Sequence, residues 1–251
     1  MKISIITVCY NSSLTIYDTI KSVNNQTFSN IEHIFIDGGS NDKTVDIINN
    51  SSKREKIIVS EKDKGLYDAM NKGIALATGD LIGVLNSDDV YSNKNVITNI
   101  FNQINNLKVD SIYGDLIYTK FNDLNEITRY WKAGRFKKRN FLFGWMPPHP
   151  TFFVKKEIYL KFGSFNLTLN SASDYEIMLR FLYKECISTT YINEVLVKMR
   201  SGGKSNQNFR SRLNGNREDR LAWKLNNLKP SIFTFLLKPI RKISQFISKP
   251  N

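Results

Sequence analysis

The chain has 251 residues, 41% of them apolar, so it can bury one substantial core and need not divide into two independent domains. Its two cysteines, Cys9 and Cys186, lack metal-ligand spacing, which argues against a disulfide framework or a zinc site and fits a reducing cytosol. The formal net charge of +13 is concentrated in residues 129–161 and 198–251, which weakens the nucleic-acid-binding interpretation that the total alone suggests.

The first 85 residues alternate between predicted strands and helices. Short apolar runs bounded by polar turns predict strands over residues 3–8, 31–36, 56–60 and 81–85. Helical spacing of apolar residues predicts helices over residues 14–24, 44–50 and 66–77. The first run is too short for a signal-peptide core, so we expect no targeting segment. This alternation predicts a parallel sheet with helices on both faces.

Beyond residue 110 the alternation loosens, and mixed structure is expected. Strands are predicted over residues 111–119, 128–133 and 189–197, and helices over residues 156–162, 173–184 and 210–226. In α/β sheets ligands collect beyond the carboxyl ends of the strands. The polar segments after the first, second and fourth predicted strands should therefore share one crevice.

The segment Asn86-Ser87-Asp88-Asp89 directly follows the fourth predicted strand. A carboxylate at a strand end inside a crevice can bind a hard divalent cation, which can bridge the two phosphates of a nucleotide diphosphate. Taken alone, the segment is more typical of an aspartate-rich turn or a helix N-cap. Its interpretation therefore depends on the motifs around it.

Four separated motifs occur in the order found in family 2 glycosyltransferases of the GT-A fold. They are Thr7-Val-Cys-Tyr10-Asn11, Asp37-Gly-Gly-Ser40-Asn-Asp42, Gly65-Leu-Tyr-Asp68-Ala-Met-Asn71-Lys-Gly73 and Asn86-Ser-Asp88-Asp89. The chain resembles this family, which implies an α/β fold with a Rossmann-like, mostly parallel central sheet flanked by helices. The resemblance also implies a nucleotide-sugar site formed by Thr7, Tyr10, Asp37, Asp68, Ser87 and Asp88. In it, Tyr10 and Asp37 would line the base and ribose pocket, and Asp88 would bind Mn²⁺ or Mg²⁺.

The segment Ala172-Ser173-Asp174-Tyr175-Glu176 resembles the one that supplies the catalytic base of this family. Asp174 would accept the proton of the acceptor hydroxyl as that oxygen attacks the anomeric carbon. The alternative is helix capping, since Ser173 and Asp174 both suit a helix N-terminus. The upstream motifs favour the catalytic interpretation.

Some positions depart from the family pattern. Asn86 stands at the first aspartate of the metal motif, Gly38 replaces a second aspartate, and Met70 stands where many relatives have arginine. Compensating charge could come from lysines at positions 62, 64 or 72, although a solvated lysine is the commoner explanation of each. Residues 198–205 lie where many relatives carry a histidine that completes the metal site, and this chain has none there.

The proline-rich segment at residues 145–153 resembles a family segment near the acceptor. His149 suits either an acceptor contact or a structural hydrogen bond. Trp145 could stack on a sugar ring, but an aromatic residue beside two prolines more often simply packs. The prolines fix the local backbone, which favours a shaped loop.

The C-terminal stretch is basic and amphipathic. Apolar residues recur at helical spacing, although Pro239 is expected to kink or interrupt the helix; they are Phe233, Leu236, Leu237, Ile240, Ile243 and Ile247. The stretch is too short and too charged to span a bilayer. Peripheral contact with an anionic membrane and packing on the catalytic domain are the two interpretations.

The sequence thus predicts a GT-A catalytic domain over residues 1–228 and a basic tail over residues 229–251. Residues 1–110 would bind the nucleotide sugar, and residues 111–228 would bind the acceptor. The resemblance implies an inverting, metal-dependent hexosyl- or N-acetylhexosaminyltransferase that acts on a polyprenyl-linked saccharide in bacterial surface polysaccharide synthesis. Family frequency favours a UDP-sugar donor and leaves GDP- and dTDP-sugars as alternatives. The enzyme would work in the cytoplasm or on the cytoplasmic face of the inner membrane, with no nucleic acid partner. The alternatives are a sugar nucleotidyltransferase and a non-catalytic nucleic-acid or lipid-binding module.

Overall fold

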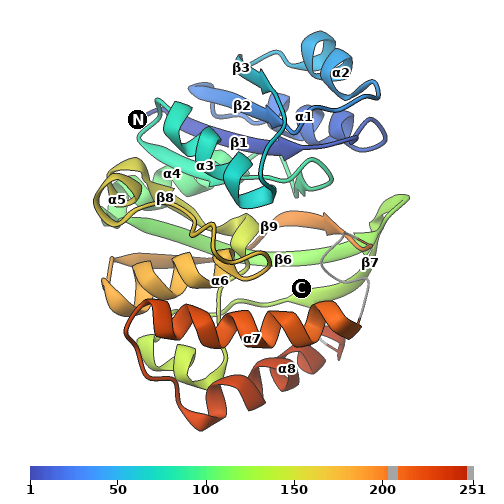
Figure 1. Cartoon of the computed structure of the whole chain (residues 1–251). Helices are drawn as coiled ribbons and strands as arrows, with labels where there is room; N and C mark the ends of the chain where they lie inside the picture. Colours follow the sequence, from blue (N-terminus) through green and yellow to red (C-terminus); the bar gives the residue numbers. More distant parts are fainter. Residues whose placement is uncertain (203–208, 248–251) are drawn as a thin grey trace.

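The computed structural model describes residues 1–202 and 209–247. Within these ranges the strands are β1 Ile3–Cys9, β2 Ile31–Asp37, β3 Glu55–Ser60, β4 Leu81–Val84, β5 Val90–Tyr91, β6 Ser111–Lys120, β7 Asp123–Trp131, β8 Phe153–Lys155 and β9 Thr189–Arg200. They form one sheet in the order β3-β2-β1-β4-β8-β6-β9-β5, and β7 pairs with β6 (Figure 1).

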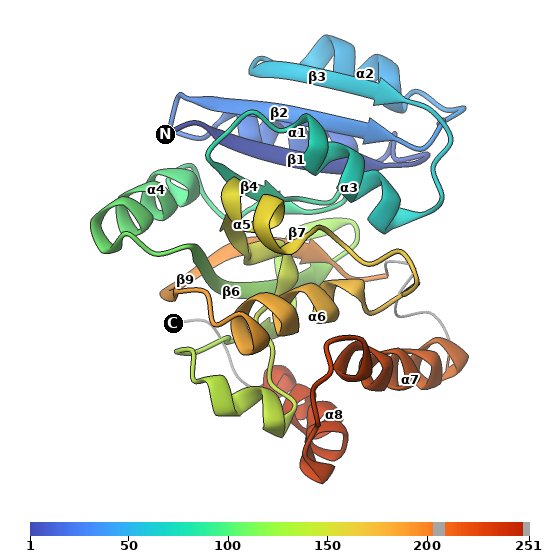
Figure 2. The same cartoon turned by 60° about the vertical axis from the view of Figure 1, so that its left-hand side comes forward.

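The helices cover this sheet on both faces and extend below it (Figures 1 and 2). They are α1 Ile16–Asn24, α2 Thr44–Ser51, α3 Leu66–Leu76, α4 Val96–Leu107, α5 Lys156–Phe162, α6 Ser173–Met178, α7 Phe209–Leu225 and α8 Ile232–Ile247. Two 3₁₀ segments, η1 Lys138–Phe143 and η2 His149–Thr151, lie in the second half, and a π-helix, η3 Leu179–Lys184, continues α6.

The first half of the sheet is parallel, as the alternation of elements predicts. Strands β3, β2, β1 and β4 pair in parallel, and every residue of β1 and β2 is buried. Successive side chains of β1 point to opposite faces. Ile6 packs in the cluster that includes residues of α3, and Ile5 packs in the cluster that includes residues of α4. Both faces of the sheet therefore carry core.

The second half continues the same sheet with mixed pairing. Strand β8 runs antiparallel to both β4 and β6, whereas β6 and β9 are parallel. Strand β7 is antiparallel to β6, and β5 is antiparallel to β9. The mixed structure expected beyond residue 110 is thus confirmed, and both predicted parts of the catalytic domain contribute strands to one sheet.

Helix α8 lies at the end of the molecule opposite β3 and α2 (Figures 1 and 2). It packs on η1 and β7 and continues through Pro239, so the predicted interruption at this proline is wrong. Lys249, part of the predicted tail, and residues 203–205 of the 198–205 segment lie outside the described residues. Among the described residues, no helix is both long and apolar enough to cross a membrane.

Gly144 allows α8 to approach the end of η1. Its φ of 72° is in the left-handed region, and a Cβ there would lie 2.6 Å from the carbonyl oxygen of Thr234. We expect Gly144→Ala to lower the free energy of unfolding by about 3 kcal/mol, because it adds a clash to backbone strain. Urea denaturation measures this loss.

Gly134 provides the matched control for this prediction. Its φ is 71°, but no atom lies within 4 Å of the position of a Cβ. Gly134→Ala should therefore cost only the strain, about 1 kcal/mol. Equal losses in the two variants would contradict the close approach between Gly144 and α8.

Candidate active site

Hydrogen bonds join the loops that follow β1, β2 and β4. The hydroxyls of Ser12, after β1, and Ser87, after β4, lie 2.8 Å apart. The backbone N–H of Asn11 donates to the Ser40 hydroxyl, after β2, at 2.7 Å. The three polar segments therefore meet at one edge of the sheet, as their positions after parallel strands predict.

Asp37 and Tyr10 lie in this group of loops. Asp37 is fully buried, and its carboxylate accepts hydrogen bonds from the Ser40 backbone N–H at 2.9 Å and from the Ser60 hydroxyl at 2.6 Å. These bonds fix the loop after β2. Tyr10 is 54% exposed. It therefore presents its ring at the surface of the site, where a base could stack.

Asp63 is a residue of this region that the sequence analysis missed. A Cβ on Gly38 would lie 2.8 Å from the Asp63 carboxylate and 3.4 Å from the Tyr10 ring. Asp63 also accepts a hydrogen bond from the Gly65 backbone N–H at 2.8 Å, which holds it beside α3. A carboxylate from the β3–α3 loop thus fills the space next to Gly38, where a second aspartate is missing.

Thr7 and Asp68 are less open to a ligand than Tyr10. Thr7 is fully buried, and its hydroxyl lies 2.9 Å from Nε2 of His33 in β2, so it pairs two strands inside the core. Burial also lowers the pKa of His33 to about 3, and its ring is therefore neutral. Asp68 accepts the Lys64 backbone N–H at 3.0 Å, which ties the first turn of α3 to the loop before it.

The segment after β4 forms a tight acidic turn. Asp89 is fully buried and accepts a hydrogen bond from the Asn86 side-chain amide at 3.0 Å. Its second oxygen, Oδ1, and the Asn86 Oδ1 have no hydrogen-bond partner among the described residues. Burial, reinforced by the charge of Asp88, raises the pKa of Asp89 well above its usual value. Asp89 is thus the internal support of the turn, and Asp88 is its more exposed carboxylate.

Arg200 holds this turn from the end of β9. Its guanidinium is buried and donates to the backbone carbonyl of Asp88 at 2.9 Å and to the Asp18 carboxylate at 2.5 Å. Burial raises the pKa of Asp88, and the charge of Arg200 opposes that rise. Arg200 lies within the 198–205 segment, which lacks the expected histidine. In the sequence, Arg200 is only a cationic residue at the end of a predicted strand. That feature is too common to identify a site residue.

Asp88 fits a divalent cation as a single protein ligand. Its side chain is partly exposed, and among the described residues no other side chain donates a hydrogen bond to its carboxylate, which leaves the oxygens accessible to a ligand. The described residues hold no group of three His, Cys, Asp or Glu side chains able to surround a metal. Mg²⁺ in nucleotide sites is commonly bound by one or two carboxylates, with water and phosphate oxygens completing the set. The residues present fit that pattern and not a closed protein cage.

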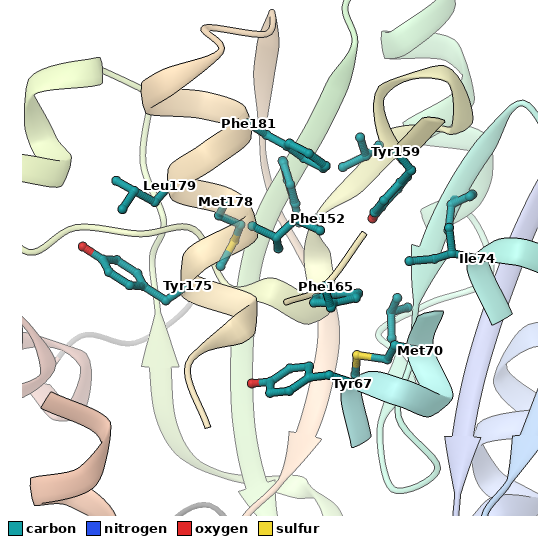
Figure 3. Packing of buried hydrophobic residues seen from close by; sticks show 14 of the residues in the cluster. Tyr67, Met70, Ile74, Phe152, Tyr159, Phe165, Tyr175, Met178, Leu179 and Phe181 are labelled. Atoms are coloured by element: carbon teal, nitrogen blue, oxygen red, sulfur yellow. The ribbon is translucent and has the colours of Figure 1, made fainter. Parts of the chain in front are cut away.

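Asp174 lies in the first turn of α6 and contacts the N-terminal half of the chain. Its carboxylate accepts a hydrogen bond from the hydroxyl of Tyr67 in α3 at 3.1 Å. Figure 3 shows Tyr67 pointing from α3 toward the helix that carries Tyr175. Burial, reinforced by the charge of Asp174, raises the pKa of Tyr67, so its hydroxyl remains a donor. Asp174 is partly exposed and is not enclosed by this contact.

His149 and Trp145 occupy different surroundings. The Tyr67 ring stacks on Phe165 at 5.5 Å, and His149 packs edge-on against the same Phe165 ring at 5.5 Å. Burial lowers the pKa of His149, although the negative charge of the nearby Asp174 opposes this. Trp145 is buried, and its indole N–H donates to the Ala133 carbonyl at 2.8 Å. That contact favours the packing interpretation of Trp145.

The acidic turn and Asp174 lie within electrostatic reach of one side chain. Tyr118 of β6 has a raised pKa because it is buried, and the negative charges of Asp89 and Asp174 contribute to the rise, while Arg129 opposes it. The carboxylates of the β4 turn and of α6 thus both act on this phenol.

Comparisons with known proteins give the family of this fold and site. The model of the family described as "Glycosyl transferase family 2" matches residues 4–166. An uncharacterized glycosyltransferase of Mycobacterium tuberculosis is 34% identical over 181 residues, which cover 71% of this chain and 68% of that protein. A PGL/p-HBAD biosynthesis glycosyltransferase of Mycobacterium bovis is 28% identical over 208 residues, 81% of this chain and 78% of that protein.

The chain belongs to glycosyl transferase family 2. Membership makes it a glycosyltransferase, and decides against both the sugar nucleotidyltransferase and the non-catalytic binding module. Solved structures support the same fold. TarS 1–349 of S. aureus, in complex with UDP-GlcNAc, has a TM-score of 0.69 and 16% identity over 90% of this chain and 65% of that one. This chain spans 43% of the longer S. aureus TarS chain.

A second solved relative carries a metal. The mannosyltransferase PcManGT of Pyrobaculum calidifontis, in complex with GDP-Man and Mn²⁺, has a TM-score of 0.65 and 14% identity over 98% of this chain and 69% of that one. At such identities the likeness concerns the fold. The fold is therefore the GT-A fold expected from the sequence.

Proposed function

We propose that this family member is an inverting glycosyltransferase that moves a hexosyl or N-acetylhexosaminyl group from a UDP-sugar to a hydroxyl of a lipid-linked saccharide. The observation that carries the proposal is the contact between Asp174 and Tyr67. It joins the candidate base in the second half of the chain to α3, which lies in the chain between the loop after β2 and the loop after β4. A base so placed is suited to an acceptor hydroxyl that attacks a sugar held by the first half.

The residues of the donor side would bind and orient the nucleotide sugar. Tyr10 offers an exposed ring for the base, and the buried hydrogen bonds of Asp37 shape the loop beside it. Asp88 would hold Mn²⁺ or Mg²⁺, which when bound neutralises the charge of the donor diphosphate. Arg200 fixes the Asp88 backbone and adds a positive charge next to it.

The residues of the acceptor side would handle the proton. Asp174 would accept the proton of the attacking hydroxyl, leaving an oxygen able to bond to the anomeric carbon as the sugar–phosphate bond breaks. Attack from the face opposite the leaving diphosphate gives inversion. Tyr67 would orient the Asp174 carboxylate through its hydrogen bond, and His149 lies beside the same aromatic group.

A relative and the basic tail support our proposal for the biological role. A relative of this chain bears the name PGL/p-HBAD biosynthesis glycosyltransferase, which supports a glycan-building role. We place the enzyme in bacterial surface polysaccharide synthesis, acting in the cytoplasm or peripherally on the cytoplasmic face of the inner membrane. A polyprenyl-linked acceptor would be presented at that face.

The test of the function is donor turnover. Purified protein is incubated with a panel of UDP-, GDP- and dTDP-sugars, with and without Mn²⁺, and nucleoside diphosphate release is measured. Release from a UDP-sugar that requires Mn²⁺ is the expected result. The stereochemistry of the product, read by NMR, tests inversion. Release of inorganic pyrophosphate instead of nucleoside diphosphate would contradict the proposal.

Removing the Tyr67 hydroxyl should slow transfer without weakening donor binding. Tyr67→Phe keeps the ring stacked on Phe165 but loses the hydrogen bond to Asp174. A hydrogen bond to a charged group contributes about 1.5–3 kcal/mol, so we expect kcat to fall roughly 10-fold to 100-fold. Tyr159→Phe is the control, because Tyr159 is also buried but packs against Phe181. Equal kcat values for the two variants would exclude an orienting role.

A further inference from the structure

Helix α8 packs on the domain through polar side chains and through Phe235, which lies against the main core cluster. The Thr234 hydroxyl donates to the Leu142 carbonyl at 2.9 Å, and the Arg241 guanidinium donates to the Phe143 carbonyl at 2.9 Å. Farther along, Lys238 forms an ion pair with Asp219 at 2.6 Å. Gln245 accepts a hydrogen bond from Arg129 of β7 at 2.7 Å. These four helix residues lie within about 60° of one another around the helix axis, at 100° per residue.

The apolar side of α8 faces outward. The exposed fractions are 76% for Ile232, 52% for Phe233, 60% for Leu236, 56% for Ile240 and 60% for Ile243. These five residues, called here the α8 apolar face, lie within an arc of about 100° opposite the packed polar residues. A surface helix of a globular domain normally buries its apolar stripe. Helix α8 instead leaves these apolar residues exposed. Large exposed apolar patches mark interaction sites.

The surroundings of the α8 apolar face are cationic. No acidic residue occurs after Asp219 in the sequence. Lys229 and Lys242 are exposed in or just before α8, and Arg241 is also exposed although its guanidinium binds the Phe143 carbonyl. The exposed run Lys137-Lys138-Arg139 precedes the part of η1 on which α8 packs. An apolar stripe flanked by cations is complementary to the interface of an anionic bilayer, where the apolar side enters the acyl boundary and the cations meet the headgroups.

We propose that the α8 apolar face docks on anionic lipid. A second copy of this chain would bring the same cations against those of the first, and like charges oppose that pairing. The polar contacts of α8 hold it on the domain, so docking the helix also orients the domain on the membrane. Docking itself does not depend on the proposed function. Only its biological use does, because a membrane surface would carry the lipid-linked acceptor.

Vesicle sedimentation tests the docking. The full chain is mixed with vesicles of phosphatidylcholine alone or of phosphatidylcholine with an equal part of phosphatidylglycerol, at low and high salt. The test variant is Leu236→Gln/Ile240→Gln, which changes two exposed side chains. The control is Leu14→Gln/Leu160→Gln, which changes two leucines that are 85% and 76% exposed elsewhere. Circular dichroism melts establish that all forms are folded.

We expect wild-type protein to bind the anionic vesicles at least tenfold more tightly than the neutral ones, with weaker binding at high salt. The α8 variant should lose at least tenfold in partition, and the control less than twofold. Equal partition of the wild type and the α8 variant would overturn the proposal. A dimeric wild type together with a monomeric α8 variant would also overturn the proposal, because a second copy of the chain would then cover the α8 apolar face. Nucleotide release without vesicles is measured in parallel, and its absence would count against the proposed function alone.

Discussion

Asp174→Asn is expected to lower kcat for sugar transfer by about 10³-fold while leaving donor affinity within about twofold, because a positioned general base contributes roughly 10²–10⁴-fold. The amide keeps the size of the side chain and can still contact the Tyr67 hydroxyl, but it cannot accept the acceptor proton. Single-turnover transfer measures the chemical step, and calorimetric titration with the donor measures binding.

Asp123→Asn provides the control for this prediction. Asp123 begins β7 at an exposed turn and accepts a hydrogen bond from the Asn125 backbone N–H at 2.8 Å. The same change of charge there should leave kcat unchanged. If Asp174→Asn transferred sugar at the wild-type rate, Asp174 would not be the catalytic base. Its position in the first turn of α6 and its contact with Tyr67 would then be structural.

The N-terminal half of the fold could be predicted because its sequence signals are local. Strands such as Ile3–Cys9 are mostly apolar runs between polar turns, as expected of buried parallel strands. The two-residue strand Val90–Tyr91 and the three-residue strand Phe153–Lys155 exist only through pairing with distant strands, and no local period reveals them. Helix α4 was missed although its buried isoleucines have helical spacing.

The sequence offers candidate site residues only where a single residue stands in a motif. Asp88 and Asp174 stand in recognisable segments, but the contact of Asp174 with Tyr67 joins residues 107 positions apart. In the same way, Asp63 lies beside Gly38 only because the β3–α3 loop returns to the end of β2. Such contacts depend on tertiary packing, and a single sequence holds no record of them.

The tail shows a different limit of sequence analysis. The amphipathic pattern of α8 predicts a helix with one apolar side, and the structure confirms the helix. The pattern does not say which side faces the protein. Polar contacts such as the ion pair between Lys238 and Asp219 decide that, so the helix packs on the domain and still exposes its apolar residues. The two interpretations of the tail are therefore compatible.

Asp88→Asn is expected to abolish the gain in donor affinity that Mn²⁺ gives, a loss of roughly 10-fold to 100-fold, because an amide oxygen is a weaker ligand than a carboxylate. The substitution keeps the backbone carbonyl that Arg200 binds, so the turn should retain its shape. Donor titrations with and without Mn²⁺ in wild type and variant form a cycle that isolates the metal-dependent part of binding.

The cycle separates Asp88 from the other charges of the site. Asp46→Asn on exposed α2 serves as the control and should leave the effect of Mn²⁺ unaltered. If Asp88→Asn bound the donor with the same response to Mn²⁺ as wild type, the cation would be held by other groups or would not be used. Because Arg200 places a fixed positive charge beside Asp88, metal-independent donor binding should survive in the variant. The metal and Arg200 would thus make separable contributions to holding one diphosphate.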